Sequence, residues 1–257
     1  DLVSAEDLRV PGFEATLYWR HPRRGLLPPQ AFMPAVESAR LTLPVGRWML
    51  REACHQVARW RQRHPSLPVG ILHVALSGGE VAQPDAIEHL RRALGEAGVR
   101  GECLKLHIDE KSATRDPDAT QAFCRALKAE GLSVGISDYG TGFCSLAFLR
   151  RLDIDFLQVT EALTQESRAD AQPSVLSATV GLARALRLGV IFTGVNNTDQ
   201  LALLSQFEGG ALQGTLLSAP LAEHESWRWL EGIEDGSIPE YSGVWKFRHD
   251  PGLGAPA

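Results

Sequence analysis

The sequence predicts an α/β fold, a barrel of alternating strands and helices of the (β/α)8 type. Short apolar runs alternate with longer helical patterns along almost the whole chain, which is typical of a parallel sheet covered by helices. The chain has 257 residues, close to the roughly 250 of one such barrel. Because 44% of the residues are hydrophobic, they suffice for one large core, and closure into a barrel is favoured over an open sheet.

Seven segments have the composition of strands. They are Phe13 to Trp19, Val69 to Ser77, Cys103 to Asp109, Leu132 to Ile136, Phe156 to Thr160, Gly189 to Val195 and Ala211 to Leu216. Helical spacing of apolar residues predicts the remaining elements. These are Pro28 to Ala39, Val45 to His64, Pro84 to Gly98, Pro117 to Gly131, a helix after Cys144, Ser174 to Leu188, Thr198 to Phe207 and Glu223 to Glu231. Two helix ends have direct signals, because Pro65 cannot continue a helix and Gly98 suits a left-handed cap.

The barrel is expected to span residues 1–235, with a C-terminal tail at residues 236–257. The segment from Arg20 to Leu27 is expected to be a basic loop. The tail is rich in Gly and Pro but contains Tyr241, Trp245 and Phe247. We therefore expect it to pack on the barrel or to extend from it.

Composition excludes several classes of function. The net charge is -5 and the pI is near 5.9, which argues against nonspecific nucleic-acid binding because phosphate contacts need clustered Lys and Arg. No apolar run approaches the roughly 20 residues of a membrane helix. The four cysteines lack CxxC spacing, so we expect them to be reduced in a cytoplasmic protein and not to hold zinc.

One strand–turn–helix segment, LSVGISDYGTGFCSLAFL from Leu132 to Leu149, has polar residues at the end of its strand. Carboxylates past the carboxyl ends of buried strands are where α/β barrels place their working groups. The segment resembles the D-D-F-G-T-G-Y-S-S-L signature of EAL domains, the bacterial phosphodiesterases and receptors for cyclic di-GMP. The resemblance extends from Asp1 to Trp229, and the opening motif G-F-E-A-L-x-R-W matches the residues from Gly12 to Trp19.

The resemblance implies an EAL-type (β/α)8 barrel. In that family an extra strand precedes the one that carries the glutamate of the E-A-L triplet. Here this first strand is expected to be truncated or missing, since few residues precede Phe13.

The resemblance also implies a pair of Mg²⁺ or Mn²⁺ ions held by oxygen ligands at successive strand ends. Four functional positions of the family are retained, and they are Glu14, Glu110, Asp138 and Gln213. Five others are replaced, and they are Ala75, His107, Ser137, Gln158 and Thr193, which stand for Asn, Glu, Asp, Lys and Glu. Further changes are Thr160, Asn196, Thr215, Leu217 and Ala219. Hard divalent ions need carboxylates and carbonyls, so we expect no metal cofactor and no catalytic residue.

The scaffold glycines are kept while the polar positions change, which predicts that the fold survives and the chemistry does not. We expect a catalytically inactive module that acts on another protein or on itself as a dimer, through Cys144 to Leu149. Its mouth is expected to be dry or neutral. Glu110 is expected to brace the loop that follows Asp138.

Three alternatives remain open. One is a metal-independent receptor for cyclic di-GMP, with Glu14, Asp138 and Gln213 as its contacts, although Tyr18 replaces an arginine that such receptors keep. Another is residual phosphodiesterase activity. The third is a Zn²⁺ or Fe²⁺ site in which His107 joins Glu14 and Asp138, since these ligand types suit such ions.

Overall fold

A curled, eight-stranded sheet forms the centre of the molecule, and the computed structural model describes residues 3–4, 12–66, 72–165, 175–207, 209–222, 225–226 and 229–230. The strands are β1 Val3–Ser4, β2 Phe13–Glu14, β3 Trp19–His21, β4 Gly25–Leu27, β5 Leu72–Leu76, β6 Leu104–Asp109, β7 Ser133–Tyr139, β8 Phe156–Val159, β9 Gly189–Phe192 and β10 Gly210–Leu212. The sheet order is β1-β10-β9-β8-β7-β6-β5-β2, and every neighbouring pair is parallel except β1 with β10.

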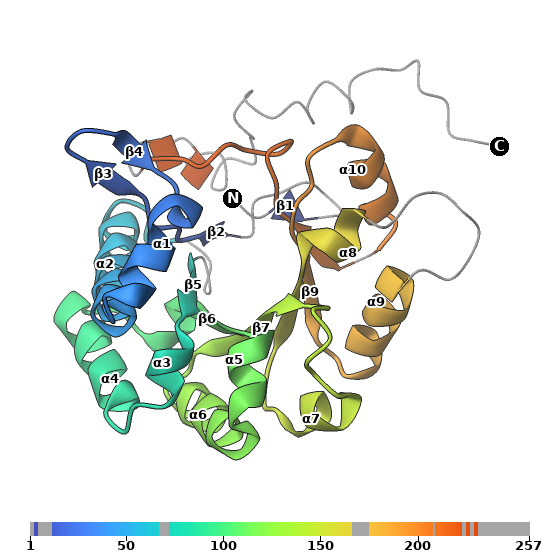
Figure 1. Cartoon of the computed structure of the whole chain (residues 1–257), viewed down its shortest axis with the longest axis horizontal. Coiled ribbons are helices and arrows are strands. Elements are labelled where there is room, and N and C mark those ends of the chain that lie inside the picture. Colours follow the sequence, from blue (N-terminus) through green and yellow to red (C-terminus); the bar gives the residue numbers. More distant parts are fainter. Residues whose placement is uncertain are drawn as a thin grey trace.

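Helices cover the outer face of the curl (Figure 1). They are α1 Pro29–Ser38, α2 Thr42–Arg63, α3 Gly78–Val81, α4 Ala86–Ala97, α5 Glu110–Arg115, α6 Pro117–Ala129, α7 Leu146–Arg151, α8 Glu161–Gln165, α9 Val175–Ala185 and α10 Thr198–Leu204, with a 3-10 turn at Gly101–Cys103. Among the residues described, no helix is both long and apolar enough to cross a membrane. The parallel strands with outer helices confirm the predicted barrel class.

Side chains alternate between the two faces of each strand, so the sheet has one apolar region on each face. On β6, Leu104, Leu106 and Ile108 join the large core under the helices, while His107 lies on the opposite face because successive side chains of a strand point to opposite sides. Inside the curl, a small cluster forms around Phe156 and includes Ile191 and Ala211.

On the inner face of the sheet, the Phe156 ring lies close against the backbone of Gly135. Ala75, His107, Gly135 and Phe156 are register neighbours on four adjacent strands. A β-carbon on Gly135 would lie 2.3 Å from the Phe156 ring, so the position needs a residue without a side chain. The ring also contacts the edge of His107 at a centroid distance of 6.5 Å.

All seven predicted strands are present, with two corrections at the start of the chain. The strand predicted from Phe13 to Trp19 ends at Glu14, and the predicted basic loop from Arg20 is a hairpin of β3 and β4. The Nδ1 atom of His21 accepts hydrogen bonds from the backbone of Arg23 and Arg24 at 3.0 and 3.2 Å, which holds the turn without any apolar pattern in the sequence.

The preceding strand that was expected to be truncated or missing is represented by β1, two residues long and antiparallel to β10. No main-chain ladder joins β1 to β2 within the described part of the sheet. Three one-turn or two-turn helices, α3, α5 and α8, were not predicted, because each is too short for a periodic pattern. The tail at residues 236–257 lies outside the described residues, as does much of the predicted helix from Glu223 to Glu231.

Candidate functional site

The mouth of the curl, at the carboxyl ends of the parallel strands, brings together four of the residues that the sequence singled out. Glu14 ends β2, His107 lies on β6, Gln158 on β8, and Gln213 follows β10. Parallel strands end at one edge, which is why positions far apart in the chain meet there. Asp138 reaches the same region from β7.

The carboxamide of Gln158 is the centre of the contacts at the mouth. Its Nε2 atom donates to Glu14 Oε2 at 2.8 Å and to Gln213 Oε1 at 3.2 Å. The side chain is only 6% exposed. Two of the retained family positions are therefore engaged by a neutral amide from within the protein.

His107 lies against the other oxygen of Glu14. The distance from Nε2 to Glu14 Oε1 is 3.5 Å, and neither ring nitrogen has a hydrogen-bond partner. Burial lowers the pKa of His107 below its usual range, although Glu14 and Asp138 oppose that shift. The imidazole is 3% exposed, and its burial favours the neutral form beside Glu14.

Asp138 is held in an unusual backbone conformation. Its φ is +53°, in the left-handed region that few residues other than glycine adopt, and the pairing of β7 with β8 shifts register between Ile136 and Tyr139. Such bulges re-aim a side chain at the end of a strand. Desolvation raises the pKa of the Asp138 carboxyl, and the negative charge of Asp109 raises it further.

On the side of the mouth formed by β8, β9 and β10, the polar side chains are hydrogen-bonded within the protein, and one of them is the Glu161 carboxylate. Thr193 Oγ1 donates to the carbonyl of Val159 at 2.7 Å. Asn196 Nδ2 donates to Glu161 Oε1 at 2.8 Å, and Asn196 Oδ1 accepts from Thr215 Oγ1 at 2.7 Å. Asn196 and Thr215 bond to each other, whereas Thr193 bonds to the main chain and Asn196 also to Glu161. The mouth differs from the dry or neutral one expected from the sequence, because Glu161 lies on this side and Glu14, Asp109 and Asp138 on the other.

A pair of hard divalent ions does not fit the residues present. Ala75 has no ligand atom in its side chain, and Ser137 offers a hydroxyl where a charged oxygen is needed. Within the described ranges, no group of three His, Cys, Asp or Glu side chains is arranged to hold a metal ion. The alternative Zn²⁺ or Fe²⁺ site at His107, Glu14 and Asp138 gains no support from this geometry.

Glu110 contacts a different part of the protein, the loop after Asp138. Its carboxylate accepts five hydrogen bonds, from the backbone N–H groups of Gly140, Thr141, Phe143 and Cys144 and from the Thr141 hydroxyl, at 2.6 to 3.0 Å. Burial alone would raise the pKa of Glu110, but the bonds from Thr141, Cys144 and Gly140 outweigh it and lower the pKa below its usual value. The bracing contacts expected of Glu110 are present, and they need no metal.

The loop and α7 present apolar side chains outward. Phe143 and Leu146 are 56% and 57% exposed, whereas Phe148 and Leu149 are buried in the core. Any contact with a partner at this segment therefore involves the first pair.

Sequence reasoning missed two residues of the site. Asp109 faces the mouth beside His107 and caps α5 by accepting from the backbone of Ser112 at 2.8 Å. The sequence could have indicated Asp109, since it lies two residues after His107 and residues two apart on a strand share a face. Glu161, the partner of Asn196, lies on the unpredicted helix α8 and had no comparable signal.

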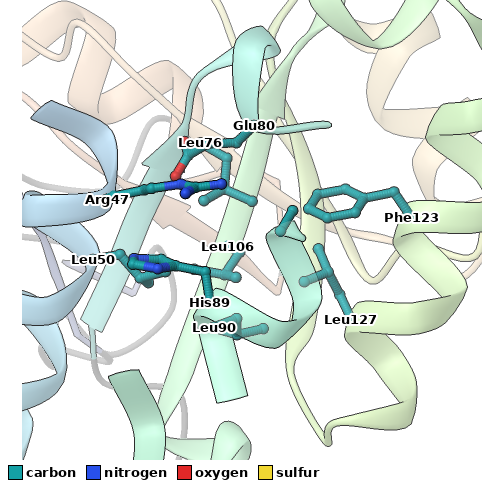
Figure 2. A pocket seen from close by; sticks show the side chains of 10 residues that line it. Arg47, Leu50, Leu76, Glu80, His89, Leu90, Leu106, Phe123 and Leu127 are labelled. Atoms are coloured by element: carbon teal, nitrogen blue, oxygen red, sulfur yellow. The ribbon is translucent and has the colours of Figure 1, made fainter. Parts of the chain in front are cut away.

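A second hollow lies away from the mouth, between the sheet and helices α2, α4 and α6 (Figure 2). Its volume of about 10 Å³ leaves room for one water at most. Arg47, Glu80 and His89 line it beside apolar side chains. We therefore assign it to packing.

Comparisons with known proteins show which family has this architecture. A family model described as "EAL domain" matches residues 2–220. The chain is 34% identical over 212 residues to the bifunctional diguanylate cyclase/cyclic di-GMP phosphodiesterase MucR of Pseudomonas aeruginosa, covering 82% of this chain and 30% of that protein. It is 32% identical over 222 residues to the cyclic di-GMP phosphodiesterase NbdA of the same organism, covering 86% and 28%.

Among solved structures, the chain is similar to the "PaMucR Phosphodiesterase, c-di-GMP complex". The TM-score is 0.81 at 32% identity, with 88% of this chain and 91% of that chain covered. The chain spans about 30% of the length of the curated relatives described above.

Replacing Glu110 by Gln is expected to loosen the loop. The amide would turn an NH₂ group toward backbone N–H donors, so we expect a loss of roughly 1–3 kcal/mol in the free energy of unfolding and faster amide exchange at residues 140–144. Because the folded pKa of Glu110 is lowered, its stabilisation is full above the unfolded pKa and is lost as the pH falls through the folded pKa.

Denaturant unfolding between pH 7 and pH 3 and hydrogen exchange would measure both effects. Glu102→Gln is the matched control, since Glu102 is paired only with the exposed Arg100 at the surface. Equal stability and equal exchange in Glu110→Gln and Glu102→Gln would contradict the bracing role.

Proposed function

The chain belongs to the EAL domain family, and on that premise we propose that it is a catalytically inactive member that serves as a regulatory or protein-interaction module in bacterial cyclic di-GMP signalling. The observation that carries the proposal is the contact of Gln158 with Glu14 and Gln213. In the family a lysine stands at this position. Here a neutral amide satisfies the two retained polar groups from inside the protein.

Loss of charge at the mouth supports the absence of phosphodiester chemistry. Hydrolysis through a metal pair needs oxygen ligands that neutralise the attacking and leaving oxygens. Ala75 and Ser137 do not supply them, and His107 replaces a carboxylate with a buried neutral ring. No step of hydrolysis is assigned to the residues that remain.

The interaction role rests on the loop after Asp138. Glu110 holds this loop through five hydrogen bonds, so its exposed Phe143 and Leu146 are displayed in a fixed arrangement whether or not a metal is bound. We infer that the segment from Cys144 to Leu149, with Phe143 beside it, contacts a second copy or another protein. Because the relatives are far longer than this chain, we also propose that it acts as the cytoplasmic signalling part of a larger protein.

The receptor alternative keeps Glu14, Asp138 and Gln213 as contacts but has uncharged side chains at two positions where the family has a cation. Tyr18 and Gln158 stand where receptors and enzymes of the family have Arg and Lys. Each hydrogen bond to a charged group contributes roughly 1.5–3 kcal/mol, so the loss of two weakens binding about a hundredfold or more. The inactive module is therefore preferred.

We predict that the purified protein does not hydrolyse cyclic di-GMP in the presence of Mg²⁺ or Mn²⁺. Separation of the linear dinucleotide by chromatography would measure this, with a chelator as control. Ser137→Asp alone is expected to stay inactive, because His107 and Thr193 would still lack the carboxylates that the family has at these positions. Linear product from the natural chain that disappears with chelator would refute the proposal, and calorimetric binding of intact cyclic di-GMP at low micromolar concentration would favour the receptor instead.

Leu146→Asp is expected to weaken self-association without unfolding the chain, since Leu146 is exposed. Light scattering over a concentration series would report the mass of the natural chain and of the variant. The control is Val175→Asp, which places the same charge on another exposed apolar residue, on α9. If both variants and the natural chain are monomers at every concentration, self-association through this segment is excluded, and a separate partner protein remains as the occupant.

A further inference from the structure

One side of the mouth is acidic, and within the described part of the chain no cation is paired with it. Glu14, Asp109 and Asp138 lie at the carboxyl ends of β2, β6 and β7. No Lys or Arg of the described chain forms an ion pair with any of the three, and no hydrogen bond is made by the exposed Asp138 carboxylate in that part of the structure. The pKa of Asp138 is raised by desolvation and then by the negative charge of Asp109, with a smaller effect of Glu14 in the same direction.

A second observation points to the same place independently of the charges. His107 is 97% buried, it faces Glu14, and neither of its ring nitrogens has a hydrogen-bond partner. Buried polar atoms are normally paired, and each exception needs an explanation. One nitrogen of an imidazole donates a hydrogen bond and the other can accept one, so a ligand with an N–H donor would supply a partner that the protein does not.

The chemistry of the three carboxylates and His107 limits the class of ligand that could bind them. The carboxylates and His107 do not converge on one point in the way that metal ligands do, at least among the side chains that the structure describes. Spread acceptors instead suit a cation with several N–H donors, such as a planar guanidinium or a primary ammonium. Gln158 is a neutral amide where the family has a lysine, so this position brings no positive charge to Glu14.

We propose that the acidic side of the mouth binds an organic cation, a guanidinium or primary ammonium group, held by Glu14, Asp109 and Asp138 with His107 as a hydrogen-bond partner. This inference rests on the proposed loss of nucleotide chemistry at the same mouth. The same negative charge disfavours a dianionic cyclic dinucleotide and favours the cation. The group reaches the mouth either on a small molecule or on a basic side chain of a partner protein.

Calorimetric titration at low salt tests the proposal with two probes. Agmatine represents the small molecule, and the peptide acetyl-Gly-Arg-Gly-amide represents a side chain. At least one is expected to bind the natural chain. Asp138→Asn is expected to weaken that binding about tenfold or more, because a charge-assisted hydrogen bond is lost, and Asn tolerates the left-handed backbone at this position.

A matched control excludes general surface attraction. Glu88→Gln removes one negative charge from the exposed face of α4 and is expected to leave binding unchanged. Glu14→Gln is a second variant inside the site and is expected to behave like Asp138→Asn. Binding of agmatine alone assigns the site to a small molecule, and binding of the peptide alone assigns it to a partner protein.

Three results would overturn the inference. These are no binding of either probe, equal weakening in Glu88→Gln and Asp138→Asn, and displacement of the probe by Mg²⁺, Mn²⁺ or Zn²⁺ at lower concentration than the probe itself needs. A failure of the proposed function is recognised separately, since it would give linear dinucleotide product. Absence of cation binding together with absence of product would leave the inactive module standing without this ligand.

Discussion

One carboxamide, that of Gln158, joins side chains from both ends of the curled sheet. Glu14 belongs to β2, at one end of the strand order, and Gln213 follows β10, next to the other end. The two contacts cross the mouth and hold its inner groups together. A lysine at this place would carry a charge into the mouth, whereas the amide pairs the same neighbours without one. The carboxylates at the ends of β2, β6 and β7 therefore face a neutral amide from β8.

The scaffold and the site obey different constraints. Gly135 leaves room for the Phe156 ring, and Glu110 collects the N–H groups of a tight loop, so a change at either position has a direct cost in stability. Ala75 has no such duty, since it is exposed on β5. A fold of this kind can therefore keep its backbone while its metal ligands are replaced.

The local sequence pattern was sufficient to predict the strands but not the side-chain contacts between them. Apolar alternation and Gly or Pro boundaries identified all seven parallel strands, because those signals lie within a few residues of each other. The hairpin at Trp19–Leu27 has no such pattern, and main-chain pairing together with the His21 side chain holds it. The bond between Gln158 and Glu14 joins positions 144 residues apart, so nothing in the local sequence announces it. The residue types at the mouth were predictable, whereas their pairing required the fold.

Binding of Mn²⁺ tests the central claim most directly, because the account holds that the fold is intact and only the ligands are missing. Paramagnetic resonance of free Mn²⁺ should be unchanged by the natural chain. It should fall in a variant that restores oxygen ligands with Ala75→Asn, His107→Glu, Ser137→Asp, Thr160→Asp and Thr193→Glu, after circular dichroism has confirmed that the variant is folded. Capture of Mn²⁺ by the natural chain would contradict the account, as would a folded variant that captures none.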